Sequence, residues 1–165
     1  MDIKSFELPS SIGDLKHLRY LNLSYSKITS LPESTSSLYN LQTLLLKGCF
    51  YLTKLPEKIE NLVNLRHLNI TNAKSIIEMP AGIAKLKSLR TLSNFVVGKD
   101  KIIDLMNLES LQGTLCISHL ENMLDANDAR KVNLKGKKNL DTLEMEWNGM
   151  VIYKMQELRQ VFLTC

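Results

Sequence analysis

Leucines recur along the chain in a frame that repeats about every 24 residues. Its second copy places Leu38, Leu41, Leu44 and Leu46 at successive steps of three, three and two residues. The final step of two is the spacing of a short strand with one buried face, because side chains alternate along an extended backbone. A fixed period of this length indicates a solenoid, in which each repeat buries its apolar strip against the next repeat.

Proline dipeptides separate the copies of this frame. Leu-Pro or Met-Pro pairs begin at residues 8, 31, 55 and 79, at intervals of 23, 24 and 24 residues. Proline lacks the N–H that a strand interior needs, so these positions are expected to be connections between strands. The following residues space their apolar side chains three apart, which suits a short 3₁₀ segment. Ile12, Ile59 and Ile83 are expected to point inward there, whereas the second copy has Thr35 and should pack more loosely.

Stacked copies of the frame predict a parallel sheet with aligned buried side chains. The first buried column would contain Leu21, Leu44, Leu68 and Leu92, and the next would contain Leu23, Leu46 and Ile70. The predicted fold is therefore α/β, a leucine-rich-repeat solenoid of about six repeats. Its curved parallel sheet would form the concave side, and short 3₁₀ or helical segments would form the convex side.

The frame divides the chain into three parts. Residues 1–98 are expected to form regular repeats, and residues 99–147 irregular ones, since the interval from Leu92 to Leu115 is still 23 residues. The 28 residues from Leu115 to Leu143 are long for one repeat, which predicts an inserted helix over residues 125–134. Residues 148–165 form a divergent C-terminal tail, whose apolar spacing predicts a helix over residues 153–163.

Residues between the buried leucines are expected to face solvent on the concave side. They mix aromatic, amide, hydroxyl and basic side chains, which is the composition of a protein-recognition face. Leu45 is the apolar exception and a candidate contact residue. We predict a protein-binding surface that comprises Tyr20, Asn22, Ser24, Tyr25, Gln42, Thr43, Leu45, Lys47, Arg66, His67, Asn69, Thr71, Arg90 and Thr91.

The charge pattern gives no indication of a nucleic-acid partner. The formal net charge is +4, from 21 basic and 17 acidic residues that are spread along the chain, and no basic block of five or more occurs. Nucleic-acid binding would be predicted from a clustered basic face or stripe. We therefore expect a protein partner and no nucleic acid, and the sequence leaves the oligomeric state open.

No arrangement of catalytic or cofactor-binding residues is present in the sequence. The chain lacks a Gly-x-x-x-x-Gly-Lys-Ser/Thr sequence, and His17, His67 and His119 lie in separate parts of the solenoid. Its three cysteines, at positions 49, 116 and 165, match no metal-ligand spacing, and we interpret the first two as packed thiols. Glu144 and Glu146 share a strand face, which we interpret as a solvated acidic edge. We expect no enzyme activity, no catalytic residue, no cofactor and no metal site.

The sequence predicts a cytoplasmic location. The first five residues lack the apolar segment of a secretory signal, and no stretch approaches the length of a membrane span. We therefore expect a soluble, intracellular chain without a membrane span.

The chain from residue 8 to about residue 147 resembles the leucine-rich-repeat region of plant disease-resistance proteins. These are the intracellular nucleotide-binding immune receptors (NLR) with a coiled-coil amino terminus. The segments that carry the resemblance are 8–24, 38–49, 64–70, 89–98, 113–122 and 137–147. The blocks Ser-Asn-Phe-Val-Val-Gly (93–98) and Leu-Glu-Met-Glu-Trp (143–147) are more particular to this family than the leucine frame is.

This resemblance implies a recognition module that takes part in the defense response. In that family, the repeat array senses pathogen effectors, directly or through a guarded host protein, and holds the nucleotide-binding domain inactive until it does so. The coiled-coil and nucleotide-binding domains are not found in these 165 residues, so we expect a truncated form with exposed apolar edges. The alternative is a stand-alone leucine-rich-repeat scaffold or decoy that binds a signalling protein.

Overall fold

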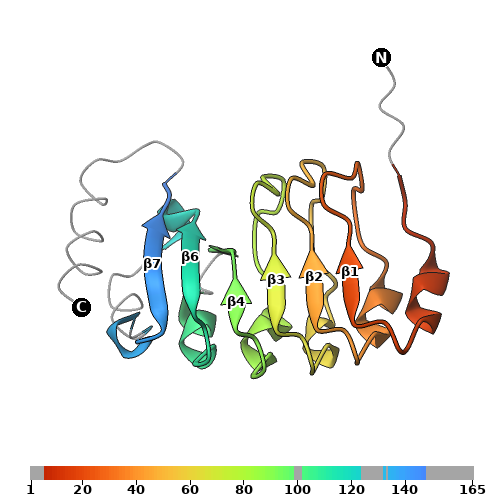
Figure 1. The fold of residues 1–165 in the computed structure, drawn as a ribbon. Helices are drawn as coiled ribbons and strands as arrows, with labels where there is room; N and C mark the ends of the chain where they lie inside the picture. Colours follow the sequence, from red (N-terminus) through yellow and green to blue (C-terminus); the bar gives the residue numbers. More distant parts are fainter. Residues whose placement is uncertain (1–5, 99–101, 124–131, 133, 148–165) are drawn as a thin grey trace, which may run out of the picture.

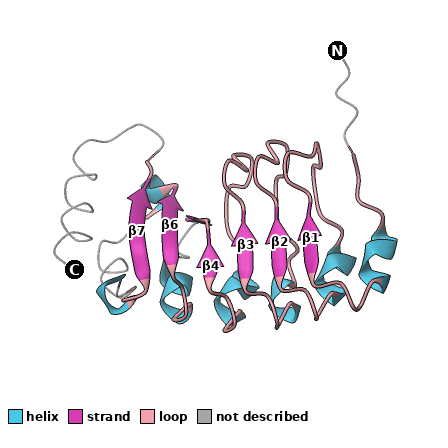
Figure 2. Ribbon diagram, in the orientation of Figure 1, coloured by secondary structure: helices cyan, strands magenta, loops and turns pink. Residues whose placement is uncertain are grey.

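The computed structural model describes residues 6–98, 102–123, 132 and 134–147, in which short strands alternate with 3₁₀ helices (Figure 1). The strands are β1 (Tyr20–Asn22), β2 (Thr43–Leu45), β3 (His67–Asn69), β4 (Thr91–Leu92), β5 (Asn94–Val96), β6 (Gly113–Ser118) and β7 (Leu140–Met145). The 3₁₀ helices are η1 (Ser10–Asp14), η2 (Glu33–Ser37), η3 (Ile59–Asn61), η4 (Ala81–Lys85), η5 (Ile102–Asn107), η6 (Leu120–Asn122) and η7 (Leu134–Gly136). Neighbouring strands are parallel, and most of the helices lie together along one side of the row (Figure 2). This is the predicted leucine-rich-repeat solenoid.

The register of the first sheet confirms the predicted leucine column. Leu21 pairs with Leu44, Leu44 with Leu68, and Leu68 with Leu92. Leu44, Leu68 and Leu92 are fully buried, whereas Leu21 in the first repeat is half-buried. The repeat spacing therefore sets the register, because each inward leucine packs on its equivalent in the next repeat.

Prolines begin three of the 3₁₀ helices, as the sequence predicts. Pro9, Pro32 and Pro80 have φ near −65°, with values of −67°, −64° and −64°. The carbonyl oxygen of each accepts a hydrogen bond from the amide three residues later, at 3.0, 2.9 and 3.0 Å. That later residue is the inward side chain of the connection, so the proline fixes the turn that buries it.

The inward side chain of the second connection differs from the others in chemistry. Ile59 and Ile83 are fully buried, and Ile12 packs against the core at the first repeat. Thr35 is also fully buried, but its Oγ1 has no hydrogen-bond partner in the described part of the chain. The neighbouring hydroxyls of Ser34 and Ser36 are buried and unpartnered as well. The second connection therefore differs from the others because it buries unpaired hydroxyl groups inside an apolar stack.

One prediction about the sheet is wrong, because the strands form two sheets and not one. The strand order is β1-β2-β3-β4 in the first sheet and β5-β6-β7 in the second. The frame slips after Leu92: Asn94 occupies the slot of Ile70 in the preceding repeat, and Phe95 is the next fully buried side chain. A polar residue in the inward slot and an aromatic one position later shift the strand by one residue, which interrupts the sheet at Ser93.

The side chain of Ser93 supplies one hydrogen bond that the interrupted sheet lacks. Its hydroxyl accepts a hydrogen bond of 2.8 Å from the backbone N–H of Ile70. In the preceding repeat, the equivalent N–H of Leu46 donates to the backbone carbonyl of Asn69 at 2.7 Å. The serine therefore satisfies a buried donor that the frame slip would otherwise leave unpaired.

Two other predictions concern residues outside the described part of the chain. The inserted helix predicted over 125–134 lies there apart from Val132 and Leu134, the first residue of η7, and so does the whole 148–165 tail. The division at residues 98 and 147 stays a prediction. Among the described residues, no helix has the length and apolar character needed to cross a bilayer.

Candidate recognition surface and groove

The predicted recognition residues lie on or beside the strands of the first sheet. We call the fourteen residues the open-face strip, because they are located along the exposed side of β1–β4. Seven of them are within strands, namely Tyr20, Asn22, Thr43, Leu45, His67, Asn69 and Thr91. Gln42, Arg66 and Arg90 directly precede a strand, and Ser24, Tyr25, Lys47 and Thr71 follow one within three residues.

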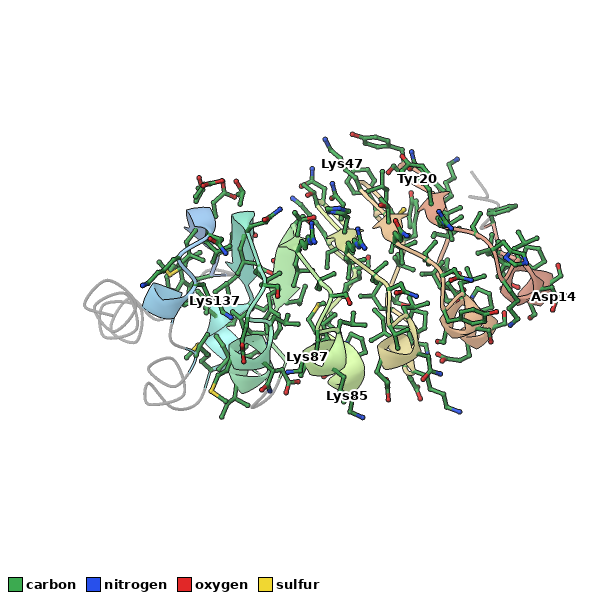
Figure 3. The ribbon with its side chains drawn as sticks, turned by 60° about the horizontal axis from the view of Figure 1, so that its bottom comes forward. Asp14, Tyr20, Lys47, Lys85, Lys87 and Lys137 are labelled. Carbon is green, nitrogen blue, oxygen red and sulfur yellow. The ribbon has the colours of Figure 1, made fainter. Side chains whose placement is uncertain are left out.

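The strip and the 3₁₀ helices are on opposite sides of the molecule. Figure 3 shows Tyr20 and Lys47 on the upper side, and Asp14, Lys85 and Lys87 on the side of the helices. The leucine columns are packed between the two. Because strand side chains alternate, burying the leucines on one face directs the seven strand residues of the strip to the other face.

Sheet pairing arranges the strand residues of the strip in two rows. The first row runs through Tyr20, Thr43, His67 and Thr91, which pair in register. The second row runs through Asn22, Leu45 and Asn69. Adjacent residues in a row are separated by one strand spacing, about 4.8 Å. The rows therefore present aromatic, hydroxyl, imidazole, amide and aliphatic groups as one fixed array.

Hydrogen bonds hold several of these side chains in place. The side-chain carbonyls of Asn22 and Asn69 each accept a hydrogen bond of 3.0 Å from the backbone N–H two residues later. The Nδ1 atom of His67 is 2.9 Å from the Oγ1 atom of Thr91 on the next strand. Each bond restricts side-chain rotation before a partner arrives, which lowers the entropy cost of binding. Leu45 is half-buried between the two asparagines and less exposed than the sequence frame suggested.

Tyr25 lies in the turn after β1 and not on the strand itself, and an equivalent turn follows β2, β3 and β6. The turn requires a left-handed residue, and Tyr25, Gly48, Asn72 and His119 fill it with φ of 62°, 68°, 60° and 60°. A Cβ atom added to Gly48 would lie 2.5 Å from the Cδ1 atom of Tyr25, so the tyrosine ring covers the glycine. The ring is still 66% exposed, which keeps it accessible to a partner.

A second surface feature, missed by the sequence reasoning, is a groove at the break between the two sheets. Its volume is about 530 Å³. One wall is the turn from Thr71 to Lys74, which follows β3, and the other is formed by the second sheet. We call the second wall the acceptor wall, and its residues are Asn94, Cys116, Ser118, Glu144 and Glu146. The sequence does contain one indication of this break, because Asn94 occupies a position where the repeat pattern calls for a buried aliphatic residue.

Cys116 faces this groove and is held as a thiol. Leu115 and Ile117 on either side are buried in the core, so alternation turns Cys116 to the open face. Burial raises the pKa of Cys116 to about 12, with the charges of Glu146 and Glu144 and a hydrogen bond to Glu146 acting in the same direction. A nucleophilic cysteine requires a lowered pKa. The thiol is therefore unsuited to nucleophilic chemistry.

Cys49 is buried in the segment that follows β2, as predicted for a packed thiol. Its side chain is fully buried and its Sγ donates to the carbonyl oxygen of Leu23 at 3.1 Å.

Across the described residues, no group of three or more His, Cys, Asp or Glu side chains is placed to hold a metal ion. His119 Nδ1 is 3.0 Å from the Oε1 atom of Glu121, next to the groove.

A family model of a leucine-rich-repeat region matches residues 5–164. The chain belongs to this leucine-rich-repeat family. Structural similarity agrees: a leucine-rich-repeat protein of Leptospira interrogans gives a TM-score of 0.65 at 24% identity, over 94% of this chain and 44% of that protein. The leucine-rich-repeat ectodomain of an Arabidopsis thaliana membrane receptor kinase gives 0.58 at 21% identity, over 88% of this chain and 18% of that ectodomain.

The leucine-rich-repeat chain is also similar in sequence to plant disease resistance proteins. A disease resistance protein of Arabidopsis thaliana is 59% identical over 143 residues, 85% of this chain and 10% of that protein. Disease resistance protein RGA2 of Solanum bulbocastanum is 49% identical over 93% of this chain and 16% of its own length. An RPP13-like disease resistance protein of Arabidopsis thaliana is 52% identical over 84% of this chain and 13% of its own length. The chain thus spans between a tenth and a sixth of these relatives, and the predicted resemblance to the repeat region of plant disease resistance proteins is confirmed.

Proposed function

We propose that this leucine-rich-repeat region is the protein-recognition module of a cytoplasmic plant immune receptor. Its ligands would be a pathogen effector, a guarded host protein or the nucleotide-binding domain of the receptor itself. Identities of 49–59% to plant disease resistance proteins support the biological context. The region would act by binding alone, without catalysis or a cofactor.

The observation that carries this proposal is the pre-ordered open-face strip. Four adjacent parallel strands hold it. Its Asn22 and Asn69 side chains are fixed by hydrogen bonds that they accept from the backbone, and its His67 side chain by a hydrogen bond with Thr91. Exposed Tyr20 and Tyr25 add aromatic contact area, and Arg66 adds a planar donor group. Tyrosine and arginine are enriched among the residues that dominate protein–protein binding energies.

The proposal is tested by removing side chains from the strip without changing the stack. The strip variant carries alanine at Tyr20, Lys47, Arg66 and His67, and a control variant carries alanine at Asp14, Lys85 and Lys87 on the helical side. Each 165-residue chain is immobilised and exposed to leaf extract, and bound proteins are quantified by mass spectrometry.

We expect the control variant to retain the proteins that the original chain captures and the strip variant to lose them. Circular dichroism first establishes that both variants are folded. Equal capture by a folded strip variant would refute the assignment of the surface.

A further inference from the structure

Two residues that line the groove between the two sheets have a polar side-chain atom without a hydrogen-bond partner in the described part of the chain. The side-chain carbonyl oxygen of Asn94 and the hydroxyl of Ser118 are buried and unpartnered among the described residues. Ser118 is only 5% exposed. An unpaired buried polar atom is unfavourable, so a donor supplied by a ligand in the groove would offset that cost.

These acceptors lie close together because their strands are paired. Asn94 pairs with Cys116, and Cys116 pairs with Glu144. Ser118 lies two residues beyond Cys116 on β6, and Glu146 lies two residues beyond Glu144, directly after the end of β7. Residues two apart on an extended chain share a face. One strand spacing is about 4.8 Å and two residues along a strand span about 7 Å, so the acceptor wall is roughly 10 Å by 7 Å. That area has room for the head group of one long side chain.

The chemistry of the wall selects a ligand that only donates hydrogen bonds. Carboxylates are acceptors when ionised, and Glu144 and Glu146 bring two negative charges to the wall. Glu146 raises the pKa of the Cys116 thiol through its charge and a hydrogen bond, and a carboxylate has lone pairs for more than one donor. Lysine ammonium and arginine guanidinium groups have several donors and no acceptor. They complement the wall in both charge and hydrogen bonding.

We infer that the acceptor wall receives a lysine or arginine side chain of the partner protein. The inference rests on the proposed recognition function and adds the chemistry of one contact to it.

Lys74 is an exposed cation on the opposite wall of the groove. Among the described residues, it is the one lysine or arginine that lines the groove. Its charge opposes a cationic guest, so its removal should strengthen binding. If the groove instead bound an anionic side chain, removing Lys74 would weaken the binding.

The test uses short probe peptides and the full 165-residue chain. Four acetylated and amidated pentapeptides carry lysine, arginine, norleucine or glutamate at the centre of a Gly-Ser background, and binding is measured by isothermal titration. Two chain variants are compared with the original: Glu144→Gln with Glu146→Gln, and Lys74→Ala. The glutamine changes preserve side-chain shape, and circular dichroism checks that the fold is intact.

We expect the lysine and arginine peptides to bind and the norleucine and glutamate peptides not to bind. The double glutamine variant should lose roughly tenfold or more in affinity, or about 1.4 kcal/mol, because its hydrogen bonds to the cation no longer involve a charged acceptor. Lys74→Ala should gain a few-fold, because it removes a like charge from the groove. Equal binding of the norleucine peptide, or unchanged affinity in the double variant, would overturn the inference.

The same double variant separates this inference from the proposed function. In the leaf-extract experiment, loss of capture by the strip variant but not by the double glutamine variant would uphold the recognition function and reject the groove contact. Loss of peptide binding in the double variant, with capture unchanged in the strip variant, would uphold the groove and reject the strip.

Discussion

Thr35 illustrates, at the scale of one residue, how a polar group weakens an apolar stack. Its position is taken by isoleucine in the neighbouring repeats, and its buried hydroxyl has no partner among the described residues. Valine has nearly the same shape as threonine but no hydroxyl to desolvate.

We predict that Thr35→Val stabilises the chain by about 1 kcal/mol, since an unpaired buried hydroxyl costs about that much or more. Urea denaturation of both proteins measures this difference. Ser37→Ala, a change at an exposed hydroxyl of the same helix, is the control. Destabilisation by Thr35→Val would mean that the hydroxyl has a partner.

Lys137 is a second residue whose burial has a measurable consequence. Its side chain is 7% exposed and its Nζ donates to the carbonyl oxygen of Leu108 at 2.7 Å. Burial lowers the pKa of Lys137, and the charge of Glu109 opposes this shift. Below the ordinary lysine pKa, the unfolded state therefore holds this proton more readily than the folded state does.

We predict that the stability of the original chain relative to Lys137→Met improves as the pH rises from about 7 to about 10, because the penalty of burying the charged amine disappears. Urea denaturation across this range measures the difference. Lys138→Met, at an exposed neighbour, controls for the loss of one positive charge. A difference that is constant with pH, or that falls, would contradict the account.

At the scale of elements, the break after β4 depends on the side chain of Ser93. The Ser93 hydroxyl accepts from Ile70, which is buried, so no water can replace it without opening the stack.

We predict that Ser93→Ala destabilises the chain by about 1–3 kcal/mol, the cost of leaving a buried backbone donor unpaired. Ser88→Ala, at an exposed serine before β4, should change stability by less than about 0.5 kcal/mol. Thermal or urea unfolding of the two variants provides the measurement. Equal stability of both would show that the donor of Ile70 finds another acceptor.

The leucine spacing was sufficient to predict the elements of the first sheet. The column from Leu21 to Leu92 and the proline connections follow from a local period, because a repeat contacts mainly its neighbours. The sheet break was not predicted, since it follows from one polar residue, Asn94, in an inward slot. The groove depends on side chains from three separate strands and a turn, and no local pattern encodes such a meeting.

At the scale of the whole molecule, the two surface features lie along one solenoid face with different charge. Arg66 and Arg90 adjoin the strands of the first sheet, and Glu144 and Glu146 lie on the second. A partner that contacts both would present acidic or polar groups to the strip and a basic side chain to the groove. Electrostatic complementarity of this kind fixes the register of a complex more than its affinity.

The central claim is that the open-face strip binds a protein. The most direct test is the affinity of the 165-residue chain for one purified plant protein from the capture experiment, measured by biolayer interferometry. The account predicts that the strip variant binds at least about tenfold more weakly, as expected when several central side chains are removed, and that the helical-side control stays within about twofold. Equal affinities of the strip variant and the original chain would contradict the account.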